Sequence, residues 1–321
     1  MESSFHDFEV DRLLQLWDRF FPARYRITAE LFAQNTTQHP LFDWGASRIV
    51  TEGDEVVAFL AVKRSPNPSL FPGRFQDIAH VSALAFRQPI DAAGIMASAK
   101  SILRDRGISH LVFGGDCGHF FPGVPEEATW LTNFLAVEGF EFGSLAYDVE
   151  RNIATYHPPK WLESELTIGR DFTVRRAVAS DRAELAAFLS KEYPGRWTFD
   201  TIEKWDEGDH NDIFLLVKGQ KIEGFAVTQT AASAKLRAGA VWHRELGESW
   251  CALGPIGIAS SLRGQKLGHL LMARALEGLR DAGGENCIID WTTLLDFYGA
   301  HGFEKSRTYT KYSLPLSIGP G

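Results

Sequence analysis

Three short segments from the first half of this chain reappear in the second half in the same order. EVVAFLAV at 55–62 resembles KIEGFAVT at 221–228, SILRDRGI at 101–108 resembles EGLRDAGG at 277–284, and NFLAVEGF at 133–140 resembles DFYGAHGF at 296–303. Ordered self-similarity is the sequence signature of a repeated structural unit, and 321 residues are enough for two domains. The sequence therefore predicts two copies of one fold.

A strand, a glycine-containing turn and an amphipathic helix follow one another over residues 253–271 (LGPIGIASSLRGQKLGHLL). The turn places unpaired backbone N–H groups, two cations and two glycines at a helix N-terminus, where the helix dipole also favours an anion. Neither the GxxxxGK[ST] loop nor the GxGxxG fingerprint is present. The segment is either a pyrophosphate-binding turn or a tight connection between strand and helix.

A second segment of interest begins 30 residues after the first. Its pattern predicts a buried strand over Cys287–Trp291, a short helix over Leu294–Ala300 ended by Gly302, and a closing strand over Arg307–Leu314. Tyr298 lies in the short helix. Taken alone, it is either a core aromatic residue whose hydroxyl caps the backbone or a functional side chain.

Together these two segments resemble motifs A and B of the GNAT (GCN5-related) N-acetyltransferases. Residues 263–268 (RGQKLG) resemble Q/R-x-x-G-x-G/A, and FYGAHGF at 297–303 resembles F-Y-x-x-x-G-F. Lys266 departs from the pattern, because the family usually has glycine there. The backbone must therefore approach a phosphate with a side chain present, or the lysine must itself supply charge.

The resemblance implies an acetyl-CoA site and a catalytic tyrosine. The turn would hold the pyrophosphate, the strand before it would line the pantetheine arm, and Tyr298 would return a proton to the CoA thiolate. The residues implied in cofactor binding are Ile256, Gly257, Ile258, Arg263, Gly264, Gln265, Lys266, Leu267, Gly268 and His269.

The expected reaction is direct transfer from acetyl-CoA to a primary amine, because the sequence has no GxSxG elbow and no cysteine with a convincing histidine partner. The amine must lose a proton, so a carboxylate is expected nearby. Asp290 is the first candidate and Glu248 the second. A backbone N–H near Ile258 would hold the oxyanion. Trp291, and then Trp205, would stack on the acceptor or belong to the core.

The element order β-α-α-β-β-β-α-β-α-β over residues 170–321 matches the fold of the GNAT family. We expect an α/β fold of two tandem GNAT-type domains, each with a mostly antiparallel mixed sheet flanked by helices. The predicted boundaries are 1–152 for a degenerate first domain, 153–169 for a linker containing Pro158 and Pro159, and 170–321 for the catalytic domain. The first copy has Leu135 in place of the tyrosine and lacks the turn. It either shapes the cleft of the second copy or binds something else.

The loop 113–125 (FGGDCGHFFPGVP) is an insertion in the first copy. Asp116, Cys117 and His119 do not have the spacing of a zinc site, so no metal is expected. We expect the loop to present Phe120 and Phe121 to a neighbouring surface, as possible substrate contacts, or to seal the interface between domains. FFPGVP and IIDWTTLLDFY also resemble tandem GNAT proteins that acetylate glucosamine or glucosaminides.

Bulk composition agrees with a globular enzyme. The chain is 45% hydrophobic and has three cysteines, so reduced thiols and a cytoplasmic location are expected. The N-terminal sequence MESSFHDFEV has no signal-peptide pattern, and no membrane span is visible. A net charge of −8 argues against nucleic acid and favours a cationic small-molecule amine. The oligomeric state leaves no mark in the sequence.

Two other functions remain open at this point. The first is a reaction like that of mycothiol synthase, which also has tandem GNAT domains and acetylates a cysteinyl aminosugar. The second is a non-catalytic acyl-CoA sensor, for which Tyr298 would be dispensable.

Overall fold

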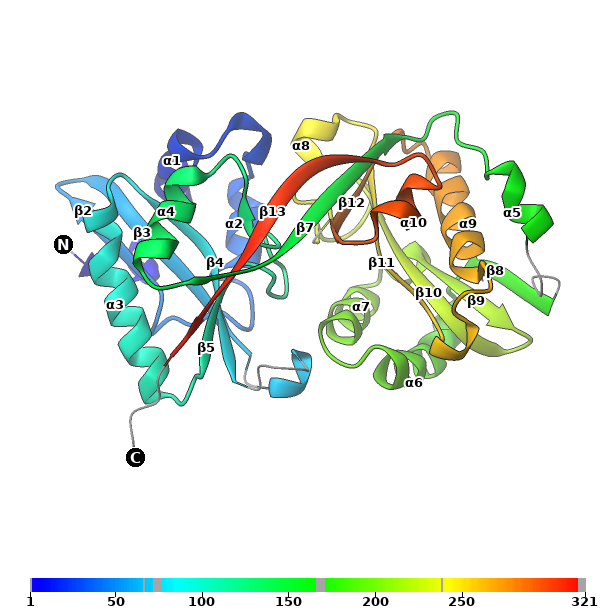
Figure 1. The fold of residues 1–321 in the computed structure, drawn as a ribbon, viewed down its shortest axis with the longest axis horizontal. Coiled ribbons are helices and arrows are strands. Elements are labelled where there is room, and N and C mark those ends of the chain that lie inside the picture. Colours follow the sequence, from blue (N-terminus) through cyan, green and yellow to red (C-terminus); the bar gives the residue numbers. More distant parts are fainter. Residues whose placement is uncertain (1, 66, 72–76, 166–170, 238, 317–321) are drawn as a thin grey trace. The chain divides into compact units, whose positions relative to one another are not determined.

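The computed structural model describes residues 2–65, 67–71, 77–165, 171–237 and 239–316. The chain divides into two compact units. The first contains residues 1–146 and 307–321, and the second contains residues 147–306. Figure 1 shows the elements of both units as ribbons.

The first unit is built on a mixed sheet with the strand order β1-β2-β3-β4-β5-β13. Neighbouring strands pair antiparallel except for β4 and β5, which are parallel. The strands are β1 (Glu2–Ser3), β2 (Arg48–Glu52), β3 (Glu55–Arg64), β4 (Ile78–Phe86), β5 (His110–Phe113), β6 (Val124–Pro125), which pairs with β13, and β13 (Glu304–Pro315). The helices are α1 (Val10–Phe20), α2 (Ala29–Asn35), α3 (Pro89–Asp105) and α4 (Thr129–Val137). Because α1 and α3 both pack on β3, that strand is apolar and buried along nearly all its length.

The second unit repeats this plan with the strand order β8-β9-β10-β11-β12-β7. Here β11 and β12 are the parallel pair. The strands are β7 (Glu141–Asn152), β8 (Phe172–Arg176), β9 (Ile213–Lys218), β10 (Lys221–Thr230), β11 (Trp250–Ile258) and β12 (Asn286–Thr292). The helices are α5 (Lys160–Glu165), α6 (Arg182–Glu192), α7 (Arg196–Asp206), α8 (His243–Leu246), α9 (Leu267–Asp281) and α10 (Leu295–Gly299). The predicted mixed α/β fold and its duplication are confirmed.

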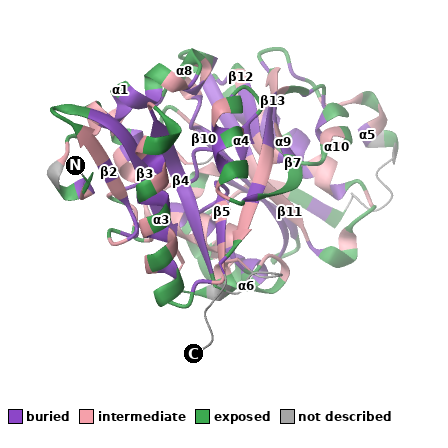
Figure 2. Ribbon diagram, turned by 60° about the vertical axis from the view of Figure 1, so that its left-hand side comes forward, coloured by how far each residue is buried: buried purple, intermediate pink, exposed green. Residues whose placement is uncertain are grey.

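Helices cover both faces of the second sheet. Leu216 of β9 lies in a cluster with the apolar face of α9, whereas its neighbour Leu215 lies in a cluster with α6 and α7. This alternation follows from the two-residue period of a strand. The middle strands β3, β4 and β10 are accordingly coloured as buried in Figure 2.

The last strand of each half belongs to the unit of the other half. Residues 147–152 of β7 pair with β12 in the second unit, and residues 309–315 of β13 pair with β6 and β5 in the first unit. The compact units therefore differ from the contiguous boundaries 1–152, 153–169 and 170–321 suggested by the sequence. Part of the predicted linker, residues 166–170, lies outside the described residues.

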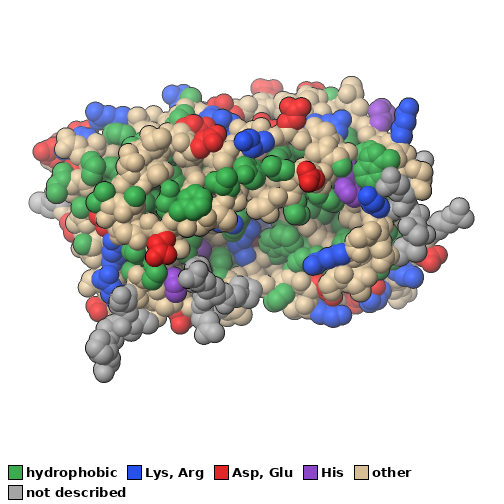
Figure 3. Space-filling model, viewed as in Figure 1, with side chains coloured by type: hydrophobic (Ala, Val, Ile, Leu, Met, Phe, Trp, Pro, Cys, Tyr) green, Lys and Arg blue, Asp and Glu red, His purple; other side chains and the backbone are tan. Residues whose placement is uncertain are grey.

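Charged side chains of both signs are interspersed over the face shown in Figure 3. In the described part of the chain, no helix combines the length and the apolar character needed to cross a bilayer.

Candidate active site

Strands β11 and β12 run side by side at their start and then separate. Trp250, Cys251 and Ala252 pair with β12, whereas residues 256–258 are paired with β10 on their other side. Pro255 has no N–H to contribute to a ladder. Residues 250–253 are buried, but residues 254–258 are half-buried. The end of β11 thus presents a strand edge at which an extended polar chain can bind.

The predicted turn connects this strand end to α9. Gly264 has φ 79° and Lys266 has φ 63°, and α9 begins at Leu267. Such left-handed residues turn successive N–H groups toward one side, which makes an anion-binding concavity at the helix N-terminus. A Cβ built on Gly264 would have no atom within 4 Å, so the turn borders open space. The exposed side chain of Arg263 adds positive charge.

Lys266 adopts the backbone conformation for which glycine is best suited. Its left-handed φ explains why the motif that this turn resembles has glycine at that position. The ammonium group lies 5.3 Å from the centre of the Trp161 ring on α5, so the side chain contacts α5.

A hydrogen-bonded pair of histidines joins the first turn of α9 to the end of α10. His269 Nδ1 and His301 Nε2 are 3.0 Å apart, and the Tyr156 hydroxyl lies 2.8 Å from His301 Nδ1. Burial, together with the charges of His269 and Arg151, lowers the pKa of His301 to about 3. His301 is therefore neutral at physiological pH.

Tyr298 projects from α10 into the interior of the second unit and is 6% exposed. Burial raises the pKa of its phenol above the usual range, and the charge of Asp290 adds to the rise. A hydrogen bond with Thr292 opposes the shift. The structure therefore keeps Tyr298 protonated, and it brings Tyr298 and Asp290 close enough to interact electrostatically.

A bulge in β12 carries Asp290 and Trp291. The register between β12 and β7 shifts between Ile289 and Thr292, and Trp291 has a left-handed φ of 43°. The backbone N–H of Trp291 donates to Asp148 Oδ1 at 3.1 Å. Bulges commonly re-aim a side chain next to a functional site. Sequence reasoning did not find Asp148, because it lies far from Trp291 along the chain.

Two further elements surround this bulge. The Arg196 guanidinium at the start of α7 lies 4.3 Å from the centre of the Trp291 ring and pairs with Asp200 at 3.1 Å. On another side, a Cβ built on Gly239 would lie 3.5 Å from Asp290 Oδ1. The segment between β10 and α8, which contains Gly239, therefore approaches the carboxylate.

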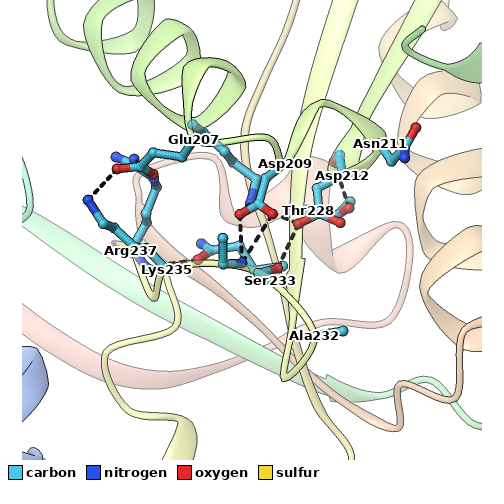
Figure 4. Close-up of polar contacts among 12 residues, drawn as sticks. Glu207, Asp209, Asn211, Asp212, Thr228, Ala232, Ser233, Lys235 and Arg237 are labelled. Atoms are coloured by element: carbon cyan, nitrogen blue, oxygen red, sulfur yellow. Dashed lines mark hydrogen bonds and ion pairs between the residues drawn. The ribbon is translucent and has the colours of Figure 1, made fainter. Parts of the chain in front are cut away.

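A cluster of ion pairs and hydrogen bonds, drawn in Figure 4, fastens that segment to the region following α7. Fully buried Lys204 of α7 contacts Asp209 at 3.1 Å and Asp212 at 2.8 Å. Ser233, from the segment, donates from its hydroxyl to Asp212 at 2.6 Å. These contacts hold the beginning of the segment that contains Gly239.

Tyr193, in the connection between α6 and α7, is a site residue that sequence reasoning missed. Its hydroxyl donates to the carbonyl oxygen of Ile258 at 2.5 Å. A Cβ on Gly257 would lie 2.5 Å from that hydroxyl oxygen, so this close approach requires glycine. Burial raises the pKa of Tyr193, and Arg263 opposes the rise. No local sequence signal links Tyr193 to the strand end.

Two residues proposed from the sequence, Glu248 and Trp205, lie away from the end of β11 at residues 254–258. Glu248 is exposed in the connection preceding β11, at the end of that strand opposite residues 254–258. Trp205 is buried in the core cluster of α6 and α7. The structure supports Asp290 over Glu248 as the carboxylate near Tyr298.

The expectation for Phe120 and Phe121 is wrong. They are 1% and 0% exposed and pack in the first unit, where Phe121 stacks on Trp17 at 5.3 Å and Phe120 stacks on Phe32 at 5.7 Å. Both phenyl rings are packed in an aromatic core that they form with side chains of helices α1 and α2. In the same loop, Asp116 forms a buried ion pair with Lys63 at 2.7 Å. Among the described residues, no group of His, Cys, Asp and Glu is arranged to hold a metal ion.

The first unit lacks the turn that distinguishes the second. Only Arg87 and Gln88 separate β4 from α3, whereas residues 259–266 separate β11 from α9. The N-terminus of α3 is capped by Asp91, whose carboxylate accepts from Gln88 N at 3.1 Å. A carboxylate at this position repels a bound anion.

A model of the acetyltransferase (GNAT) family matches residues 182–306, which include the turn, Asp290 and Tyr298. No curated protein sequence matches the chain.

Solved structures share the fold over nearly the whole chain. A glucosamine N-acetyltransferase region of a fungal multi-domain GH3 β-N-acetylglucosaminidase matches with TM-score 0.86 at 19% identity, covering 98% of this chain and 38% of that one. A GCN5-related N-acetyltransferase from Sphaerobacter thermophilus matches with TM-score 0.71 at 13% identity, covering 100% and 96%. A tandem GNAT protein of the clavulanic acid biosynthesis pathway matches with TM-score 0.65 at 13% identity, covering 100% and 99%. This chain thus spans well under half of the fungal protein, and the likeness concerns the fold.

Proposed function

Residues 182–306 of this chain belong to the acetyltransferase (GNAT) family, and we propose that the second unit transfers an acetyl group from acetyl-CoA directly to a primary amine of a small molecule. The observation that carries the proposal is the proximity of a protonated tyrosine, Tyr298, to a carboxylate, Asp290. Asp290 follows the residues of β12 that pair with β11, and its Oδ1 would lie 3.9 Å from a Cβ built on Gly254 of β11.

The residues of the turn fit the diphosphate of a CoA ester. Arg263 and the backbone N–H groups of residues 264–268 would hold it at the N-terminus of α9, next to the open space at Gly264. The edge of Ile256, Gly257 and Ile258 would hold the pantetheine amides. When bound, acetyl-CoA supplies the activated acetyl thioester.

Asp290 and Tyr298 can accept and donate the protons that the acetyl transfer requires. Asp290 accepts a proton from the ammonium form of the acceptor, directly or through water, which frees the amine lone pair. A backbone N–H near Ile258 stabilises the developing oxyanion. Tyr298 donates a proton to the departing thiolate. Because burial raises the pKa of the phenol, Tyr298 is protonated before the transfer.

Direct transfer is favoured over a covalent acyl-enzyme. Cys251 and Cys287 are buried under α9, and burial raises the pKa of the Cys287 thiol. A buried thiol held in its neutral form is a poor nucleophile.

An amino sugar is the acceptor we propose to test first. The fungal glucosamine N-acetyltransferase region shares the fold. In addition, Trp291, held against Arg196, provides an aromatic ring beside Asp290 on which a sugar could stack.

The test is release of free CoA from acetyl-CoA across glucosamine, glucosaminides, polyamines, amino acids and peptides, with a binding titration of acetyl-CoA alongside. Turnover on an amino sugar supports the full proposal, and turnover on another amine retains the reaction but replaces the substrate. Tight binding without turnover on any acceptor would favour a non-catalytic acyl-CoA sensor.

A further inference from the structure

We propose that Asp148 is a positioning residue for acetyl transfer, because it holds the backbone of Trp291 in the conformation that directs Asp290 toward Tyr298. The inference rests on the proposed function and adds a residue from a strand that precedes the turn and Tyr298 by more than a hundred positions in the sequence.

Asp148 is a carboxylate in a fully buried position of the second unit. It lies in β7, is 0% exposed, and accepts from the backbone N–H of Trp291 at 3.1 Å. Its own carbonyl oxygen accepts from the Ser306 hydroxyl at 3.3 Å, which ties β7 to the residues that follow α10. Burying a carboxylate is unfavourable unless hydrogen bonds compensate for lost hydration.

The backbone held by Asp148 is one that tryptophan seldom adopts. Trp291 has φ 43° inside the β12 bulge, and a bulky residue in the left-handed region persists only when its surroundings impose that conformation. The hydrogen bond to Asp148 is such a constraint, since it fixes the direction of the Trp291 N–H.

The first unit provides an internal comparison. In each unit the parallel strands begin to pair at a defined residue, which is His110 in β5 and Asn286 in β12. Counting four and five residues onward from these positions, Gly114 and Gly115 of the first unit correspond to Asp290 and Trp291 of the second. Both glycines have left-handed φ values, 69° and 68°. The chain therefore enters the left-handed region at this place in both units, through both glycines in the first and through Trp291 alone in the second. Glycine adopts such a φ without strain, whereas Trp291 needs a constraint from its surroundings.

The bulge determines where Asp290 points. Side chains alternate between the two faces of a strand. If the extra residue of the bulge were taken up into regular pairing, the neighbouring side chains would therefore move to the opposite face. If Trp291 relaxed to an extended conformation, the Asp290 carboxylate would turn away from Tyr298. Loss of Asp148 should therefore slow proton removal from the acceptor and leave the acetyl-CoA turn unchanged.

The first experiment compares Asp148→Ala with Asp148→Asn, which retains an oxygen acceptor of the same shape. We expect Asp148→Ala to lower kcat by about tenfold or more, with the Kd for acetyl-CoA unchanged. Asp148→Asn should restore most of kcat. Ser306→Ala is the matched control, since it removes the neighbouring hydrogen bond but does not touch the Trp291 N–H, and its kcat should match that of the parent.

A double-mutant cycle separates positioning from general stability. Glycine adopts a left-handed φ without assistance, so Asp148→Ala should have little effect on kcat in a Trp291→Gly background. In the full-length protein, hydrogen exchange at the Trp291 amide should also accelerate in Asp148→Ala and return toward the parent rate in Asp148→Asn. Equal losses of kcat in both backgrounds, or unchanged kcat in Asp148→Ala, would overturn the inference.

Tyr298→Phe, measured in parallel, distinguishes this inference from the proposed function. If Tyr298→Phe abolishes turnover while Asp148→Ala does not lower it, the positioning role alone is wrong. If neither substitution lowers turnover, the proposed chemistry is wrong as well. If Asp148→Ala does not fold, two measurements on Asp148→Asn decide the inference. The first is kcat in the Trp291→Gly background, and the second is hydrogen exchange at the Trp291 amide. An exchange rate far above that of the parent protein would overturn the inference.

Discussion

Lys266 has a left-handed backbone one residue before α9, and its ammonium group lies 5.3 Å from the centre of the Trp161 ring. Backbone strain and a cation–π contact thus occur in the same residue. A left-handed conformation costs a non-glycine residue roughly 1–2 kcal/mol, and an exposed cation–π contact contributes about 0.5–1 kcal/mol.

These two effects can be separated with a pair of variants. Lys266→Gly removes the strain and the ammonium group, whereas Lys266→Met removes the ammonium group alone. We expect the free energy of unfolding of Lys266→Gly, measured by urea denaturation, to exceed that of Lys266→Met by about 1 kcal/mol. Lys266→Gly should also bind acetyl-CoA at least as tightly as Lys266→Met. Equal stabilities would show that the turn does not strain residue 266.

Tyr298→Phe tests the role of the phenol as proton donor. The substitution retains the buried ring and removes the acidic proton, so we expect kcat to fall by about 100-fold while the Kd for acetyl-CoA stays nearly constant. Steady-state kinetics and calorimetric titration measure the two quantities. Tyr312→Phe is the control, because that tyrosine lies on β13 within the first unit. A kcat unchanged in Tyr298→Phe would remove Tyr298 from the mechanism.

Arg263→Ala tests the anion-binding turn. The exposed Arg263 lies next to the N-terminus of α9, so its loss should raise the Kd for acetyl-CoA by about tenfold at low salt, with a smaller effect at high salt because exposed charges are screened. The kcat at saturating acetyl-CoA should change little. Arg274→Ala is the control, because Arg274 lies within α9 rather than in the turn and is paired with Glu277. A salt-independent effect would indicate that Arg263 acts through its hydrogen bond with Tyr193 rather than through its charge.

Local patterns were sufficient to predict the secondary structure of the segments that carry the candidate residues. The turn before α9 and the short helix that contains Tyr298 both follow from short segments, since each depends on backbone geometry within a few residues. Asp148 and Tyr193 could not be predicted in this way. Their contacts depend on which strand lies beside β12 and on how the connection between α6 and α7 folds back onto β11.

The burial of Phe120 and Phe121 was missed for a related reason. A loop rich in glycine and proline indicates a surface connection, but helices α1 and α2 bring Trp17 and Phe32 over it, and together they form a core. The position of β13 was also beyond local reasoning. Its apolar pattern predicts a strand, but nothing in that pattern identifies β5 of the first unit as its partner.

His301 makes the stability of the second unit depend on pH in a definite direction. Its pKa is lowered to about 3 in the folded protein by burial and by the charges of His269 and Arg151, whereas an unfolded histidine has a pKa of about 6.5. Between these values the unfolded chain binds the extra proton. The free energy of unfolding should therefore fall as pH decreases from about 6.5 toward 3, by up to about 1.4 kcal/mol per pH unit.

Urea denaturation at several pH values, comparing the parent with His301→Gln, measures this contribution. Glutamine retains hydrogen-bonding capacity toward Tyr156 and His269 but does not titrate, so the variant should lose less stability on acidification than the parent. His6→Gln is the control, because His6 is an exposed residue stacked on Trp44 in the first unit and its replacement should leave the pH dependence unchanged. Identical pH dependence in the parent and in His301→Gln would mean that His301 does not remain neutral in the folded protein, and the hydrogen bonds joining Tyr156, His301 and His269 would then have to be reassigned.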